Sequence, residues 1–163
     1  PPPLPLSMLS STIARNANRG NSMSPKEWKT LIKPVNDQLY TAMLDAIGCG
    51  PYDGGCVTFA MALQDVIGGD LYVVINGHGR ASHAAVYLDG LLWDHAGPRE
   101  PQRFLYHFNR TEHLRGANAC AGFRSMADRD LPGAPRDERL KETMVTLLRE
   151  AWPEAEREPA PGP

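Results

Sequence analysis

The sequence has no marked excess of charge of either sign and no long apolar run. Its 163 residues carry a net charge of −2, and Lys and Arg are nowhere concentrated as a phosphate-binding surface would require. No apolar run approaches the roughly 20 residues of a membrane span, and the start lacks the charged-then-apolar order of a secretory signal. We therefore expect neither nucleic acid nor a membrane as a partner. A signal that has been removed stays open, because the first residue is not Met.

Cysteine is also scarce, with only Cys49, Cys56 and Cys120 in the chain. A domain of this length buries roughly two-thirds of the surface that its unfolded chain exposes, so it needs no disulfide to fold. Because the number is odd, at least one thiol is expected to be free unless it pairs between chains, which favours a reducing compartment. A bridge between Cys49 and Cys56 stays open as an alternative. No cofactor is expected.

Both ends of the chain are rich in proline and poor in residues that could form a core. They read "PPPLPLS" at the start and "PEAEREPAPGP" at the end. Such composition is typical of disorder. We expect disordered segments over 1–23 and 153–163, and one folded domain over 24–152. The first residue is Pro rather than Met, which fits a processed product or a piece of a longer polypeptide.

Four helices are predicted from capping signals and helical spacing. Ser24 followed by Pro25 is a typical helix start, and it predicts a helix over 25–33 and a second over 35–47 that ends at Gly48. Asp53 is expected to cap a third helix through "CVTFAMALQDVI", which ends at Gly68. A last helix is predicted over 137–152, where apolar residues mark one face.

Between the third and last helices the apolar pattern changes to that of strands. "DLYVVING" and "SHAAVYL" are short and rich in β-branched and aromatic residues, and Asp89-Gly90 is a strong two-residue hairpin signal before a third strand in "LLWDHAG". In 99–132, "PQRFLYHFNR" fits either a helical turn or an edge strand, and the rest is mostly turn chemistry. The predicted fold class is α+β, with N-terminal helices packed on an antiparallel sheet of three or more strands and a C-terminal helix.

Cys56 is expected in the first turn of the third helix, directly after Gly54 and Gly55. A helix N-terminus lowers the pKa of a thiol because its unpaired N–H groups and the helix dipole favour the thiolate. The same N–H groups can hold an oxyanion, and the glycines leave room for a substrate backbone. A lone cysteine in a helix is nevertheless more often a packing residue, so catalysis requires a base nearby.

The hairpin register selects a base and its partner. If Asp89 and Gly90 form a two-residue loop, Val86 faces Trp93 and side chains alternate from there. His83 and Asp94 then share one face of the sheet as diagonal neighbours. Taken singly, His83 fits a partly buried strand histidine and Asp94 a strand-end carboxylate, but the three signals together favour a Cys-His-Asp site.

With these residues assembled, "GGCVTFAMAL" followed by "SHAAVYLDGLLWDHAG" resembles the papain-like cysteine superfamily in its compact transglutaminase-like and NlpC/P60-like forms. The resemblance covers residues 54–97. It implies Cys56 as nucleophile, His83 as base and Asp94 as orienting residue, on a papain-like core. The spacing between His83 and Asp94 is shorter than is usual for transglutaminase-like domains, and no side chain is assigned to an oxyanion hole.

The activity that this resemblance implies is acyl transfer at an amide or ester through a thioester. Peptidase, amidase, glutamine deamidase and transglutaminase reactions share the core, so a protein or peptide that carries an amide is the expected substrate. The size fits a bacterial or phage effector or a toxin domain, so the expected location is the cytoplasm or, after delivery, a host or target cell. The alternative is a catalytically inactive papain-like binding module, in which Cys56 is buried and the "NGHGR" loop contributes to a recognition surface.

A metal site is the remaining alternative, because histidines and acidic residues recur through the middle of the chain. Their spacings match no tight zinc motif, and the predicted register puts His83 and His95 on opposite faces of the sheet. The residues concerned form two loose sets, His78, His83, Asp94 and His95 in one and His107, His113 and Cys120 in the other.

Overall fold

Five α-helices and a five-stranded antiparallel sheet make up residues 23–155, the part of the chain that the computed structural model describes. The predicted α+β class is confirmed. The disorder expected over 1–22 and 156–163 falls outside the described residues. Within 23–155, no helix combines the length and the apolar character needed to cross a membrane.

The helices begin and end close to where the capping signals placed them, with one helix more than predicted. Ser24 caps the first helix and accepts a hydrogen bond from the Glu27 N–H, while Gly48 ends the second in a left-handed conformation. The helices are α2 (Pro25–Ile32), α3 (Asn36–Ile47), α4 (Cys56–Ile67), α5 (Pro101–Thr111) and α6 (Glu138–Ala151), and short 3₁₀ turns are η2 (Gly116–Asn118) and η3 (Pro153–Ala155).

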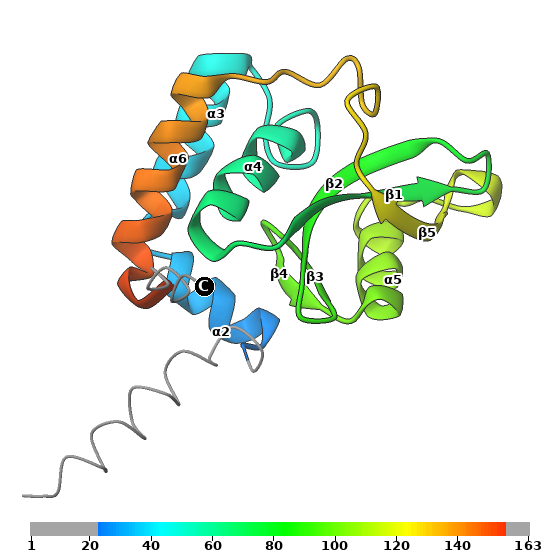
Figure 1. The fold of residues 1–163 in the computed structure, drawn as a ribbon, viewed down its shortest axis with the longest axis horizontal. Coiled ribbons are helices and arrows are strands. Elements are labelled where there is room, and N and C mark those ends of the chain that lie inside the picture. The colour runs from blue at the N-terminus through cyan, green and yellow to red at the C-terminus, as the bar shows by residue number, and fades with distance from the viewer. Residues whose placement is uncertain (1–22, 156–163) are drawn as a thin grey trace, which may run out of the picture.

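The sheet has the strand order β4-β3-β2-β1-β5, and every neighbouring pair is antiparallel. Figure 1 shows α4 on one face of this sheet, with α3 and α6 beyond it, and α5 on the other face. The site residues therefore lie on a sheet that is covered by helices on both sides. The strands are β1 (Asp70–Asn76), β2 (Ala81–Leu88), β3 (Leu91–Asp94), β4 (Gly97–Arg99) and β5 (Cys120–Ser125).

The hairpin between β2 and β3 has the predicted turn and register. Asp89 and Gly90 both have positive φ, 52° and 81°, as a two-residue turn of this kind requires. Val86 pairs with Trp93 and Leu88 with Leu91. The alternation predicted from this register is thereby confirmed, and it places His83 on the face that α5 covers.

Several expectations about the less regular segments were wrong. Within 99–132, "PQRFLYHFNR", which fitted either a helical turn or an edge strand, lies in α5, whereas the part predicted as mostly turns contains the edge strand β5, which pairs with β1. "LLWDHAG" is divided between β3 and β4, because the chain turns back at residues 95 and 96. The packed chain also continues beyond Trp152, since η3 follows and Ala155 is buried.

Three tryptophans from distant parts of the chain fix the α2 end of the core. The Trp28 ring meets those of Trp93 and Trp152 at centroid distances of 6.0 and 6.2 Å, edge to face. The Trp28 Nε1–H donates to the carbonyl oxygen of His95 at 2.9 Å. Trp28 thus ties α2 to the turn that follows β3.

Trp28→Ala is expected to lower the free energy of unfolding by about 3–5 kcal/mol, because it leaves a large cavity and an unpaired carbonyl. Chemical denaturation followed by circular dichroism measures the change. Lys29→Ala, at an exposed position of the same helix, is the control and should stay within about 0.5 kcal/mol of wild type. A loss below about 1 kcal/mol for Trp28→Ala would contradict the role of Trp28 in the core.

Candidate active site

Cys56 is the first residue of α4, and the backbone before it is closely packed. Gly55 precedes the helix, and a Cβ on Gly55 would lie 2.7 Å from the Gly50 carbonyl oxygen and 2.9 Å from Met43 Sδ. Only glycine fits there. No side chain caps the helix; Asp53, which was expected to do so, instead accepts a hydrogen bond from the Gly50 N–H. The predicted position of Cys56 is confirmed, and the predicted cap is wrong.

His83 and Asp94 form a hydrogen bond in the interior. The distance from His83 Nε2 to Asp94 Oδ2 is 3.0 Å, and the two residues are only 1% and 4% exposed. The second carboxylate oxygen, Oδ1, accepts a hydrogen bond of 2.8 Å from the Ala96 N–H. Asp94 is thus held by the backbone of the turn and in turn fixes the imidazole.

The Cys56 thiol interacts with this same imidazole. Because Nε2 is occupied by Asp94, the nitrogen available to the thiol is Nδ1, which is buried and has no hydrogen-bond partner of its own within residues 23–155. The structure therefore brings Cys56, His83 and Asp94 into one chain of contacts. Their catalytic roles stay predictions.

The contacts shift the pKa values of the thiol and the imidazole in opposite directions. Burial raises the pKa of Cys56, but the interaction with His83 and its positive charge and the N–H groups of Ala84 and Val57 outweigh it, so the pKa lies below its usual value. Burial lowers the pKa of His83, yet the hydrogen bond to Asp94 and the interaction with Cys56 raise it to about 9. Both shifts favour a thiolate beside an imidazolium.

Aromatic rings enclose the imidazole of His83. The Tyr52 ring is nearly parallel to it at a centroid distance of 5.6 Å, and the Phe108 ring stacks at 4.6 Å. Burial, with the charge of Asp94 nearby, raises the pKa of the Tyr52 hydroxyl, so Tyr52 stays neutral. These rings exclude water and restrict rotation of the imidazole, a contribution that the sequence did not reveal.

His95 belongs to a separate cluster. Its Nε2 lies 3.0 Å from Asn36 Oδ1, and the Tyr40 and Phe59 rings meet it edge to face. Burial lowers the pKa of His95, which favours the neutral ring. Asn36 is half-buried and paired with His95.

The alternatives built on other cysteines and on metal ligands find no counterpart in the described residues. All three cysteines are free, so no bridge joins Cys49 to Cys56. Burial raises the pKa of both Cys49 and Cys120. Nowhere in residues 23–155 do three His, Cys, Asp or Glu side chains come together as a metal site requires.

An open cleft of about 760 Å³ leads to Cys56. One side is formed by Tyr52, Asp53 and Gly54, and another by the turn between β1 and β2 with Arg80. The third side belongs to residues 126–137, the β5–α6 segment, which crosses near the start of α4 (Figure 1). A substrate group can therefore reach the otherwise buried thiol from this side.

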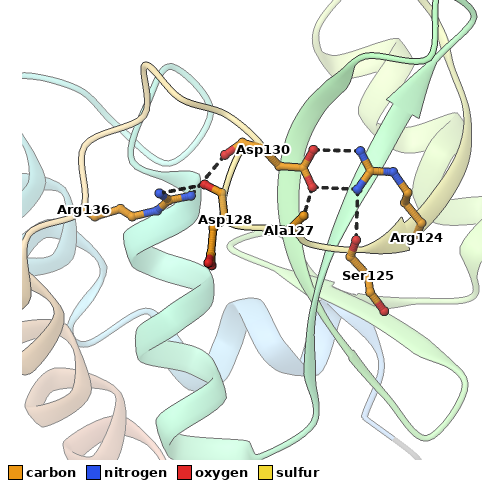
Figure 2. A network of polar contacts seen from close by, with 6 residues as sticks. All are labelled: Arg124, Ser125, Ala127, Asp128, Asp130 and Arg136. Atoms are coloured by element: carbon orange, nitrogen blue, oxygen red, sulfur yellow. Dashed lines mark hydrogen bonds and ion pairs between the residues drawn. The ribbon is translucent and has the colours of Figure 1, made fainter.

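The β5–α6 segment is held in place by a network of charges and carbonyls. The Arg124 guanidinium donates two hydrogen bonds to the carboxylate of Asp130, at 2.6 and 2.7 Å. Figure 2 shows this pair, together with Arg136, which donates to the carbonyl oxygens of Asp128 and Asp130. From α4, two residues after Cys56, Thr58 Oγ1 donates to the Pro135 carbonyl at 2.9 Å.

Comparison of the chain with family models, with curated proteins and with solved structures gave no match. Support for a function therefore comes from the geometry of this site and from the order of its residues in the chain.

Asp130→Asn is expected to loosen the wall of the cleft. Its hydrogen bonds with Arg124, assisted by the Ala127 N–H, hold the pKa of Asp130 at about 2, below the ordinary 3.8. The carboxylate therefore stabilises the fold fully above pH 3.8, and this contribution is lost as the pH falls towards 2. We expect a loss on the order of 1–2 kcal/mol at pH 6 that shrinks at pH 2.5, measured by urea unfolding.

Asp128→Asn is the matched control, because Asp128 lies in the same segment with an exposed side chain. It should leave the unfolding free energy within about 0.5 kcal/mol of wild type at both pH values. A loss for Asp130→Asn that is the same at pH 6 and pH 2.5 would show that the ionised carboxylate does not carry the effect.

Proposed function

We propose that the protein is a cysteine-dependent acyl-transfer enzyme of the papain-like superfamily that acts on an amide or ester. Cys56 is the nucleophile, His83 the acid and base, and Asp94 the orienting residue. The observation that carries this proposal is the buried 3.0 Å hydrogen bond between His83 and Asp94. The same imidazole interacts with the Cys56 thiol at the start of α4.

In the first step the Cys56 thiolate attacks the substrate carbonyl carbon and forms a C–S bond. The negative charge moves to the carbonyl oxygen, where N–H groups at the start of α4 stabilise it. Collapse of this intermediate breaks the bond to the leaving amine or alcohol, which takes a proton from the His83 imidazolium. The product of this step is a thioester on Cys56.

In the second step the neutral imidazole removes a proton from the acceptor, which attacks the thioester carbon. The C–S bond then breaks, and Cys56 leaves as a thiolate beside the imidazolium. Water as acceptor releases an acid, whereas an amine as acceptor gives a new amide. Peptidase, amidase, deamidase and transglutaminase reactions differ only in the leaving group and in this acceptor. A protein or peptide amide is the substrate that the open cleft and the resemblance favour.

Asp94 supports both steps from within the core. Its carboxylate accepts from Nε2, so it leaves Nδ1 facing the thiol and stabilises the imidazolium. The low polarity around the pair strengthens this interaction. The order of the three residues on a helix start, a strand and the following strand matches the resemblance to compact papain-like domains.

The pH dependence of Cys56 alkylation by iodoacetamide tests the nucleophile. Wild-type Cys56 is expected to react rapidly near pH 6, because the lowered thiol pKa increases the thiolate fraction while His83 stays protonated up to about pH 9. His83→Ala should react at least about 10-fold more slowly at pH 6, since burial then raises the thiol pKa. Peptide mass spectrometry assigns the label to its cysteine.

The Asp94→Asn variant and the second buried cysteine, Cys120, are the comparisons for the alkylation of wild-type Cys56. Asp94→Asn should retain an intermediate rate at pH 6, because the imidazole remains but its pKa falls. Cys120, whose pKa burial raises, should be labelled slowly in every variant. Wild-type labelling of Cys56 that begins only above about pH 8 would contradict the role of Cys56 as nucleophile and favour the inactive binding module.

A further inference from the structure

The cleft beside Cys56 is lined by charged side chains, and two of its arginines differ from the other charged residues because they form no ion pair within the described residues. The charged lining residues are Asp53, Arg80, Arg124, Arg129 and Asp130. Arg124 and Asp130 neutralise each other through their two hydrogen bonds. Oδ1 of Asp53 accepts a hydrogen bond from the Gly50 N–H, so that oxygen is engaged within the protein. The cationic groups left for a ligand are Arg80 and Arg129.

Arg80 and Arg129 reach the cleft from different segments. Arg80 ends the turn between β1 and β2, and Arg129 belongs to the β5–α6 segment. Both residues are exposed, and within the described residues neither guanidinium takes part in an ion pair. The chain as a whole has a net charge of −2, so two arginines without an ion pair in the cleft that Cys56 also lines are a local feature.

We propose that this cleft selects acyl substrates that carry a carboxylate close to the reacting carbonyl, and that Arg80 and Arg129 bind that carboxylate. The proposal rests on the proposed function, because Cys56 supplies the reacting atom. Arginine presents planar, always charged donors that match a carboxylate with two parallel hydrogen bonds. Asp53, on another side of the cleft, disfavours a second anionic group there.

The carboxylate can come from an acidic side chain or from the free end of a peptide. Three reagents that differ in one group distinguish these sources. The neutral one is bromoacetyl-glutamine amide; bromoacetyl-glutamate amide adds a side-chain carboxylate, and bromoacetyl-glutamine with a free α-carboxylate adds a terminal one. Each alkylates a thiol by the same displacement of bromide, so the ratio of its rate at Cys56 to the neutral reagent's rate reports selection alone.

For wild type at low salt we expect at least one anionic reagent to label Cys56 about 3- to 10-fold faster than the neutral reagent. The faster of the two identifies the source of the carboxylate. The double variant Arg80→Gln and Arg129→Gln should bring the ratio near that for a free thiol. At 1 M salt, where the screening length is about 3 Å, the wild-type preference should largely disappear.

Arg103→Gln is the matched control, because Arg103 is an exposed arginine on α5, outside the cleft lining. It should keep the wild-type ratio. Equal rates for all three reagents in wild type, or a ratio that survives in the double variant, would overturn the proposal. Slow labelling of Cys56 by the neutral reagent at pH 6 would instead contradict the proposed nucleophile, so the two failures are distinguishable.

Discussion

The buried hydrogen bond between His83 and Asp94 is the interaction on which the rest of the site depends. A carboxylate and an imidazolium are costly to bury, and removing one partner of such a pair costs on the order of 3–5 kcal/mol. The protein offsets this by bonding Asp94 to the Ala96 N–H and by placing the Cys56 thiol at the other side of the ring. Without Asp94 the pKa of the imidazole would fall, and the Cys56 thiolate would lose part of its stabilisation.

Three elements of the fold, β2, β3 and α4, place the side chains of His83, Asp94 and Cys56 next to one another. The β2–β3 hairpin sets His83 and Asp94 on one face, and α5 closes that face with Phe108. On the other side of the sheet, the tight backbone before α4 fixes Cys56, since Gly55 has no room for a side chain. The β5–α6 segment then leaves one open side, and its ion pair between Arg124 and Asp130 keeps that wall in place.

Local signals predicted most of this fold, and long-range contacts were what they missed. Ser24, Gly48 and the Asp89-Gly90 turn act on their own neighbours, so their consequences could be derived from the sequence. α5 was left ambiguous although Phe104 and Phe108 have helical spacing, because ten residues did not decide between helix and strand. β5 is stabilised by pairing with β1, and its "CAGFRS" has little strand character. The stacking of Tyr52 on His83 has no sequence signal.

The reaction of the protein with p-nitrophenyl acetate tests the central claim most directly, because it follows acyl transfer to Cys56 itself. We expect a burst of p-nitrophenol equal to the enzyme concentration, and one acetyl group on Cys56 when the reaction is quenched in acid and analysed by peptide mass spectrometry. The burst should be absent in Cys56→Ala and slowed in His83→Ala. Acetylation spread over Cys49, Cys120 and the lysines, with no burst and no preference for Cys56, would contradict the account.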